Sequence, residues 1–172
     1  TLTNYEVTYY RPSAEKEAAT GNITIGSAAN GMATGNVVVT QNTTSNGTAA
    51  TAGNVTVTGG KTVTVNHKMD SATDAISVQG AVNVNVTATD VTNAAGINVG
   101  TTTAVTGTVN VTSTGAAITA ATVTHSMDAI AVTGGTTVTV TQSANSTSGN
   151  AKLADNIGDI VTQGAVTVTA GN

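Results

Sequence analysis

The chain lacks cysteine, tryptophan and phenylalanine, and its only aromatic residues are three tyrosines among 172 residues. Without Cys there is no disulfide framework and no thiol nucleophile. Without Phe or Trp there is little material to fill the wide interior of an ordinary globular domain. Any core must therefore be narrow and built from Val, Ile and Ala. Because Val and Ile are β-branched and favour strands, we expect a β protein.

Charge is also scarce, since Asp, Glu, Lys and Arg make up 8% of the residues and the formal net charge is −4. Proteins that bind nucleic acid need clustered positive charge, so nucleic acid is not an expected partner. No apolar run approaches the roughly 18 residues of a membrane helix, so no membrane span is expected. A surface kept soluble by Thr, Ser, Asn and Gln is common in secreted and surface-attached proteins of bacteria and archaea. We therefore expect an extracellular or cell-surface location.

A short pattern recurs seven times: a Gly followed by alternating apolar and polar residues. The separation between successive copies varies from 14 to 29 residues. Strands of constant length joined by connections of variable length are typical of solenoid repeats. A second apolar stretch precedes several of the glycines, in NVTVTG, DAISVQG, AVTG and DAIAVTG. The seven copies begin at Gly21, Gly35, Gly60, Gly80, Gly107, Gly135 and Gly164.

Within each copy the period of two predicts which side chains face the core, because alternate residues of a strand point to opposite faces. The polar residues Thr56, Thr64, Asn83, Asn85, Asn110, Thr139 and Thr167 are predicted to face water. The inward set is predicted to be Val55, Val57, Val63, Val65, Val82, Val84, Val86, Val109, Val111, Val138, Val140, Val166 and Val168.

These patterns predict an all-β, single-domain parallel β-solenoid, or β-helix, of about seven irregular coils. A β-sandwich is the alternative, since half-buried strands suit both folds. Residues 21–172 form the Thr/Val-rich β-repeat domain. Residues 1–20 differ in kind because they hold every Tyr and Glu and the only Pro and Arg.

The N-terminal segment 1–20 is predicted to act as an interaction, cap or linker segment. One face of a strand there carries Tyr5, Val7 and Tyr9, and Pro12 ends the strand. After Ser13 the sequence AEKEAA suits one or two helical turns. An unpaired strand edge templates the addition of another strand, so Tyr5, Val7 and Tyr9 are the candidate assembly interface.

The strings GNVTVTGG, GTTVTVTQ and GAVNVNVT, over residues 21–172, resemble the repeats of filamentous-haemagglutinin-like adhesins, autotransporter passengers and other extracellular β-strand-repeat proteins of bacteria and archaea. The resemblance implies an extracellular β-fibre with a scaffold or adhesion role. It transfers no functional residue, since the chain has neither Asn-Pro-rich secretion motifs nor the GGxGxD calcium repeat.

Two similar peptides raise the question of a metal site: His67 and His125 each have a Met two residues later and an Asp three residues later. Imidazole and thioether suit soft or borderline ions. In a solenoid, however, the two His would lie about two coils, or ~10 Å, apart. We interpret the echo as repeat similarity at a corner and expect no metal or other cofactor there.

Catalysis would need paired carboxylates or an activated nucleophile. The acidic candidates in the repeats show no recurring partnership with a basic residue, and no Ser lies in a GxSxG context. We interpret them as solvated loop carboxylates and expect no enzyme. These acidic candidates are Asp70, Asp74, Asp128, Asp155 and Asp159. The loop Asp155–Asp159 offers oxygen ligands for Ca²⁺, but without the alternating spacing of a dedicated site.

The leading functional hypothesis is a structural subunit of an extracellular fibre, matrix or surface layer that self-associates end to end through strand edges into a homopolymer. The alternative is an adhesin stalk or passenger whose side wall binds cell-surface glycan. A third hypothesis is ice binding, suggested by the strings of alternating Thr, although Thr is also the polar residue best suited to an exposed strand.

Overall fold

The computed structural model describes residues 5–11, 21–43, 53–69, 73–91, 96–118, 124–127, 129–146, 152–154, 157–162 and 164–171. Within these ranges the chain is all β, as predicted, with fifteen strands and no helix. The described residues accordingly contain no helix that could cross a membrane.

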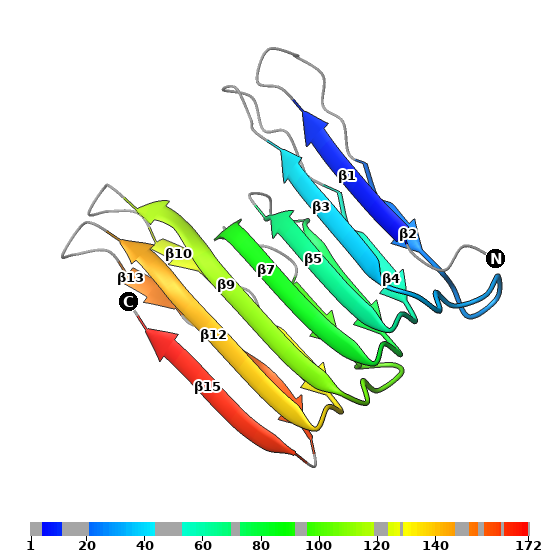
Figure 1. Cartoon of the computed structure of the whole chain (residues 1–172). Coiled ribbons are helices and arrows are strands. Elements are labelled where there is room, and N and C mark those ends of the chain that lie inside the picture. Colours follow the sequence, from blue (N-terminus) through cyan, green and yellow to red (C-terminus); the bar gives the residue numbers. More distant parts are fainter. Residues whose placement is uncertain are drawn as a thin grey trace.

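The larger sheet has seven strands, all parallel, and lies at the front of Figure 1. Its strands are, in spatial order, β1 (Tyr5–Arg11), β3 (Val37–Thr43), β5 (Thr62–Lys68), β7 (Asn83–Val91), β9 (Thr108–Ile118), β12 (Thr137–Ser146) and β15 (Ala165–Gly171).

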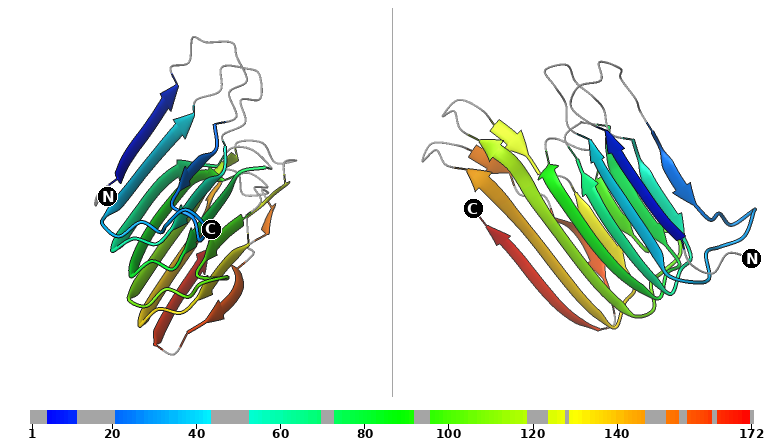
Figure 2. Two further views of the ribbon diagram at one scale, coloured as in Figure 1. Left: turned by 90° about the vertical axis from the view of Figure 1, so that its right-hand side faces the viewer. Right: turned by 45° about the horizontal axis from the view of Figure 1, so that its top comes forward.

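A second parallel sheet of six shorter strands forms the other layer (Figure 2). Its spatial order is β14 (Ile157–Val161), β11 (Ile130–Thr133), β8 (Gly96–Val99), β6 (Ala75–Gln79), β4 (Val55–Thr58) and β2 (Ile23–Ile25). A further parallel pair joins β10 (Thr124–Ser126) to β13 (Lys152–Ala154).

The chain alternates between the two main sheets, and each new strand pairs with the strand of the preceding repeat. This order explains why all strand pairs are parallel, because a strand that returns to the same sheet after visiting the other one runs in the same direction. The register keeps like residues together: Val63 pairs with Val84, Val84 with Val109, and Val109 with Val138. Alternation and register are thus properties of the repeat itself.

The core is a single hydrophobic cluster that takes in residues of both sheets. The predicted inward parity is confirmed for the valines of β4, β5, β7, β9 and β12, which are at most 2% exposed. Each fully buried Val contributes about 1.5–3 kcal/mol relative to an exposed one. The predicted outward Thr and Asn residues are all half-buried or exposed. A narrow core without Phe or Trp is therefore closed by β-branched side chains.

Three of the valines assigned inward are not buried. Val82 is 44% exposed because it precedes β7, in a corner where its backbone N–H donates to Gly60 O. Val166 and Val168 pair with the buried Val138 and Val140, yet they are 47% and 46% exposed. They lie on β15, the last strand of its sheet, so no further repeat covers them within the described residues.

The repeat pattern locates most of the strands, with two corrections. Six of the seven Gly-led copies begin strands of the seven-stranded sheet, but the copy at Gly21 begins β2 of the other sheet. The stretch AVTG at Ala104–Gly107 forms no strand, because β8 comes earlier, in GINV at Gly96–Val99. The residues between β8 and β9 make a longer corner instead.

Glycines form the corners between the sheets because neighbouring corners stack too closely for a side chain. Gly134 has a φ of 90° and donates its N–H to Val161 O at 2.8 Å. A Cβ there would run into the backbone carbonyl of Val105 in the adjacent corner. The corner therefore requires both the left-handed conformation and the missing side chain of Gly.

This packing predicts that Gly134→Ala destabilises the protein more than Gly31→Ala. Both residues have positive φ, which costs Ala about 1–2 kcal/mol, but a Cβ at Gly31 meets nothing within 4 Å. Only Gly134→Ala must also push the two corners apart. Urea unfolding of the two variants measures the difference, and equal losses would contradict the stacked corner.

Candidate functional site

The predicted interface residues Tyr5, Val7 and Tyr9 lie in β1, the first strand of the seven-stranded sheet. β1 pairs with β3 of its own chain, where these residues are in register with Val37, Val39 and Gln41. Residues 5–11 therefore continue the sheet of the repeats, and β1 keeps one edge without a strand neighbour among the described residues. The helical turns expected after Ser13 lie outside the described residues.

The opposite edge of the same sheet is β15, the red strand in Figure 1. Proteins commonly protect an exposed edge strand with charged residues or Pro. The sequence of β15, AVTVTAG, contains neither. The inward-parity valines Val166 and Val168 are also half exposed on this strand. The end of the sheet thus combines free backbone groups with uncovered apolar surface.

The six-stranded sheet also has two edge strands among the described residues, with β2 at one edge and β14 at the other. Both sheets therefore begin near the N-terminal strands and end near the C-terminal strands, with all strands parallel. A second molecule placed beyond β15 and β14 in the same orientation would present β1 and β2, so strand direction would be continuous across both sheets.

Inside the seven-stranded sheet, a row of four polar side chains, interrupted by one Ala, runs along the core. It occupies the third inward position of each central strand: Gln41, His67, Ala88, Ser113 and Gln142 are register partners in turn. All five are at most 2% exposed. Gln41 donates its Nε2–H to Gly21 O at 3.0 Å. We refer to these five residues as the buried polar row.

His67 is the titratable member of this row, and it corrects the expectation of a corner histidine. It lies within β5 and is 2% exposed. Neither ring nitrogen makes a well-formed hydrogen bond within the described residues. Burial lowers the pKa of His67 from 6.5 to about 4, although the nearby backbone of Gln41 raises it in part. The imidazole is thus neutral at pH 7.

The lowered pKa of His67 predicts that acid weakens the fold. The unfolded chain binds a proton at pH 6.5 and the folded chain only at about pH 4. The contribution of neutral His67 is therefore complete above pH 6.5 and declines as the pH falls toward 4. Between pH 7 and pH 5 the free energy of unfolding should drop by about 2 kcal/mol from this residue.

Urea unfolding at the two pH values tests this effect. His67→Gln should remove most of that pH dependence, whereas Asn66→Gln, at the exposed neighbouring position, should keep it. The same pH dependence in His67→Gln as in the wild type would show that another group is responsible.

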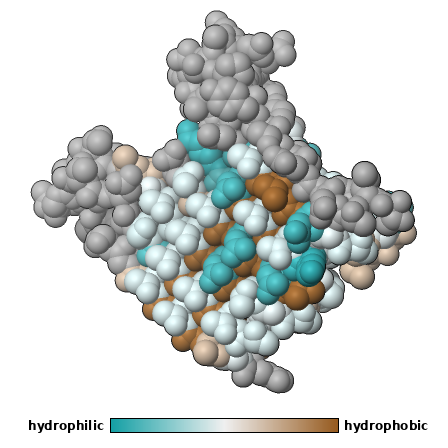
Figure 3. Space-filling model, viewed as in Figure 1, coloured by the Kyte–Doolittle hydropathy of each residue, from teal (hydrophilic) through white to brown (hydrophobic). Residues whose placement is uncertain are grey.

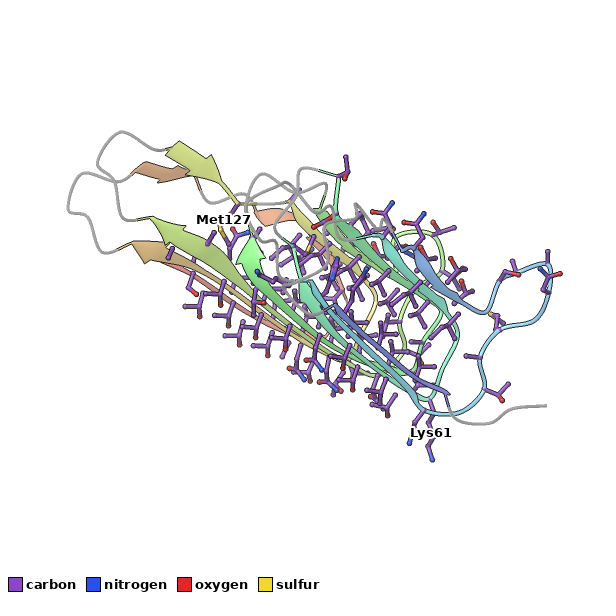
Figure 4. All side chains as sticks on the ribbon, turned by 90° about the horizontal axis from the view of Figure 1, so that it is seen from above. Lys61 and Met127 are labelled. Atoms are coloured by element: carbon purple, nitrogen blue, oxygen red, sulfur yellow. The ribbon has the colours of Figure 1, made fainter. Side chains whose placement is uncertain are left out.

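The echoed Met residues fill the core. Met69 is fully buried and Met127 is 2% exposed. Figure 4 places Met127 at the opposite end of the strands from Lys61, which follows a glycine corner. No group of three His, Cys, Asp or Glu side chains suited to a metal ion occurs within the described residues. The side chain of His125 lies outside the described residues.

Asp74 is a second correction, because this carboxylate was expected to be solvated and is instead fully buried just before β6. The candidate Ca²⁺ loop is different: Asp155 and Asn156 lie outside the described residues, as does the side chain of Asp159. Asp70 and Asp128 are also outside them.

One open pocket lies along three successive corners. The residues that line it are Ala104, Val105, Thr106, Thr133, Gly134, Gly135, Thr136, Val161, Thr162 and Gly164. These described residues offer hydrogen bonds from Thr hydroxyls and Gly backbone and apolar contact from Val side chains.

Sequence reasoning missed the buried polar row. Its signal was present, because Gln41, His67, Ser113 and Gln142 each stand two residues after an inward Val. The period of two predicts their inward direction. Only His67 is assigned a position from the sequence, at a corner, and no position is predicted for the other polar members.

Comparison with known proteins gives no match to a family model, to a curated protein or to a solved structure.

Proposed function

We propose that the chain is a β-solenoid module of an extracellular fibre, matrix or surface layer, and that copies associate end to end through the edges of both sheets. The alternation between two parallel sheets supports this proposal, because each turn of such a solenoid would contribute one strand to each sheet. The charge-poor, Thr-rich composition supports an extracellular setting.

The observation that carries the proposal is that like residues stack in register from strand to strand of both parallel sheets, so the same pattern can accept a further repeat next to β15. The inward valines of β15, Val166 and Val168, are about half exposed, while their register partners Val138 and Val140 are fully buried. Covering them with another repeat would bury apolar surface and also pair the free N–H and C=O groups of the edge. A second copy, entering with β1 and β2, offers strands of the right direction for both sheets.

A contact between the C-terminal end of one copy and the N-terminal end of the next joins two different surfaces. Such head-to-tail contacts do not close on themselves unless the rotation returns to the start, so they generate filaments. Along the filament, each added strand contributes ~4.8 Å of length. The outer faces of both sheets remain exposed along its sides.

Sedimentation velocity and negative-stain electron microscopy of the purified chain test the proposal. We expect oligomers whose size grows with protein concentration, and thin unbranched filaments. An adhesin module would instead stay monomeric at high concentration and bind a cell-surface glycan. A strictly monomeric chain would therefore overturn the fibre proposal and favour the adhesin alternative.

A further inference from the structure

The outer face of the seven-stranded sheet carries a regular array of polar side chains. Three rows cross the strands in register, with Thr as the commonest member and with Asn, Val38 and Ala165 at the other positions. We call the block on β9, β12 and β15 the threonine face. It comprises Thr108, Asn110 and Thr112 on β9, Thr137, Thr139 and Thr141 on β12, and Thr167 and Thr169 on β15.

The threonine face repeats in two directions. Neighbouring strands of a sheet are ~4.8 Å apart, and alternate residues of one strand are ~6.7 Å apart. Thr112, Thr141 and Thr169 form one continuous row, and Asn110, Thr139 and Thr167 form the next. Pale side chains in regular rows cover this part of the surface in Figure 3. Because Thr is stiff at χ1, its hydroxyl and methyl groups are held at fixed positions on this lattice.

No member of the threonine face is charged. This matters because an ammonium or carboxylate group holds its own strong hydration shell, whereas a hydroxyl donates one neutral hydrogen bond to water and accepts up to two. Lys61 lies at a corner and Lys68 near the end of β5, away from this block. Water between the rows is therefore governed by the lattice of hydroxyl and methyl groups.

The other outer face lacks this regularity. The corresponding row of the six-stranded sheet reads Thr24, Thr56, Ser77, Asn98 and Ala131, with little repetition from strand to strand. Exposed strands of this chain therefore do not carry rows of Thr merely because they are exposed. The contrast also supplies a matched control on the same molecule.

We propose that the threonine face binds ice. A surface that presents the same groups at every strand cannot single out one small molecule, but a ligand with its own two-dimensional repeat gains from every row. Ice is such a ligand, because its surface is a repeating lattice of hydrogen-bonded oxygens. Waters anchored by the rows would join that lattice, and the methyl groups would exclude competing water arrangements. The side wall of a filament would leave this face open.

Thermal hysteresis, ice-crystal shape and ice recrystallisation measured on the purified chain test the proposal. The wild type should depress the freezing point below the melting point, shape ice crystals and slow recrystallisation. Thr139→Lys, at the centre of the face, should lose most of all three effects. Thr56→Lys, an equally half-buried outward position on the other sheet, should keep them.

Circular dichroism of both variants verifies that the β structure is retained. A wild-type chain without hysteresis and without recrystallisation inhibition would overturn the proposal. Equal losses in Thr139→Lys and Thr56→Lys would also overturn it, because the activity would then not belong to the threonine face. Both outcomes leave the end-to-end assembly proposal untouched.

Discussion

Replacing Val140 with Asp should unfold a large fraction of the molecules. Val140 is fully buried in β12 and lies in an inward row with Val111 and Val168. A carboxylate there would have to ionise without a partner or take up a proton, and either costs at least about 4 kcal/mol. Because folded domains are stable by only about 5–15 kcal/mol, a large part of that margin would be lost.

Thr139→Asp is the matched control, one residue away on the same strand. Thr139 points outward and is half-buried. The carboxylate of an Asp at this position would stay in contact with water, so the substitution should change stability by less than about 1 kcal/mol. Urea unfolding followed by circular dichroism measures both variants. Similar losses from the two substitutions would show that the inward and outward faces are assigned wrongly.

Val168→Lys should block end-to-end association while leaving the monomer folded. Val168 is 46% exposed on β15, so a Lys there can extend its ammonium group into water in the single molecule. In a filament the next copy would cover it and bury the charge, and a Lys on an edge strand is a common natural barrier to strand pairing. Sedimentation velocity should therefore find monomers at concentrations at which the wild type is polymeric.

Thr169→Lys provides the comparison, because Thr169 is the adjacent exposed residue on the outward parity of the same strand. Its charge would project from the side of the filament rather than into the contact, so assembly should persist. If Val168→Lys polymerises as readily as the wild type, the contact does not use the exposed valines of β15.

The parity of the strands was predictable because it follows from the alternation of side chains alone. Val63, Val84 and Val138 carry that signal in three of the copies, and they are buried as expected. The position of β8 was not predictable, because GINV at Gly96–Val99 is a four-residue strand without the long Val-Thr alternation of its neighbours. The corner after β8 is also longer than those after β4, β6, β11 and β14, so spacing from Gly107 misplaced the strand.

The open end at β15 and the buried polar row depend on contacts between repeats that no single repeat contains. Val166 and Val138 have the same pattern around them, and only the absence of a covering repeat within the described residues makes the first exposed. Likewise His67 and Asp74 are ordinary surface residues by type, and their burial follows from the stacking of neighbouring strands. Local pattern therefore predicted direction, and stacking decided exposure.

X-ray fibre diffraction from oriented filaments of the purified chain tests the central claim most directly. If copies continue both sheets through their strand edges, every strand lies across the filament, and we predict a strong reflection at ~4.8 Å along the filament axis. A ~4.8 Å reflection perpendicular to that axis, or its absence from well-oriented filaments, would show that the molecules do not stack strand on strand and would contradict the account.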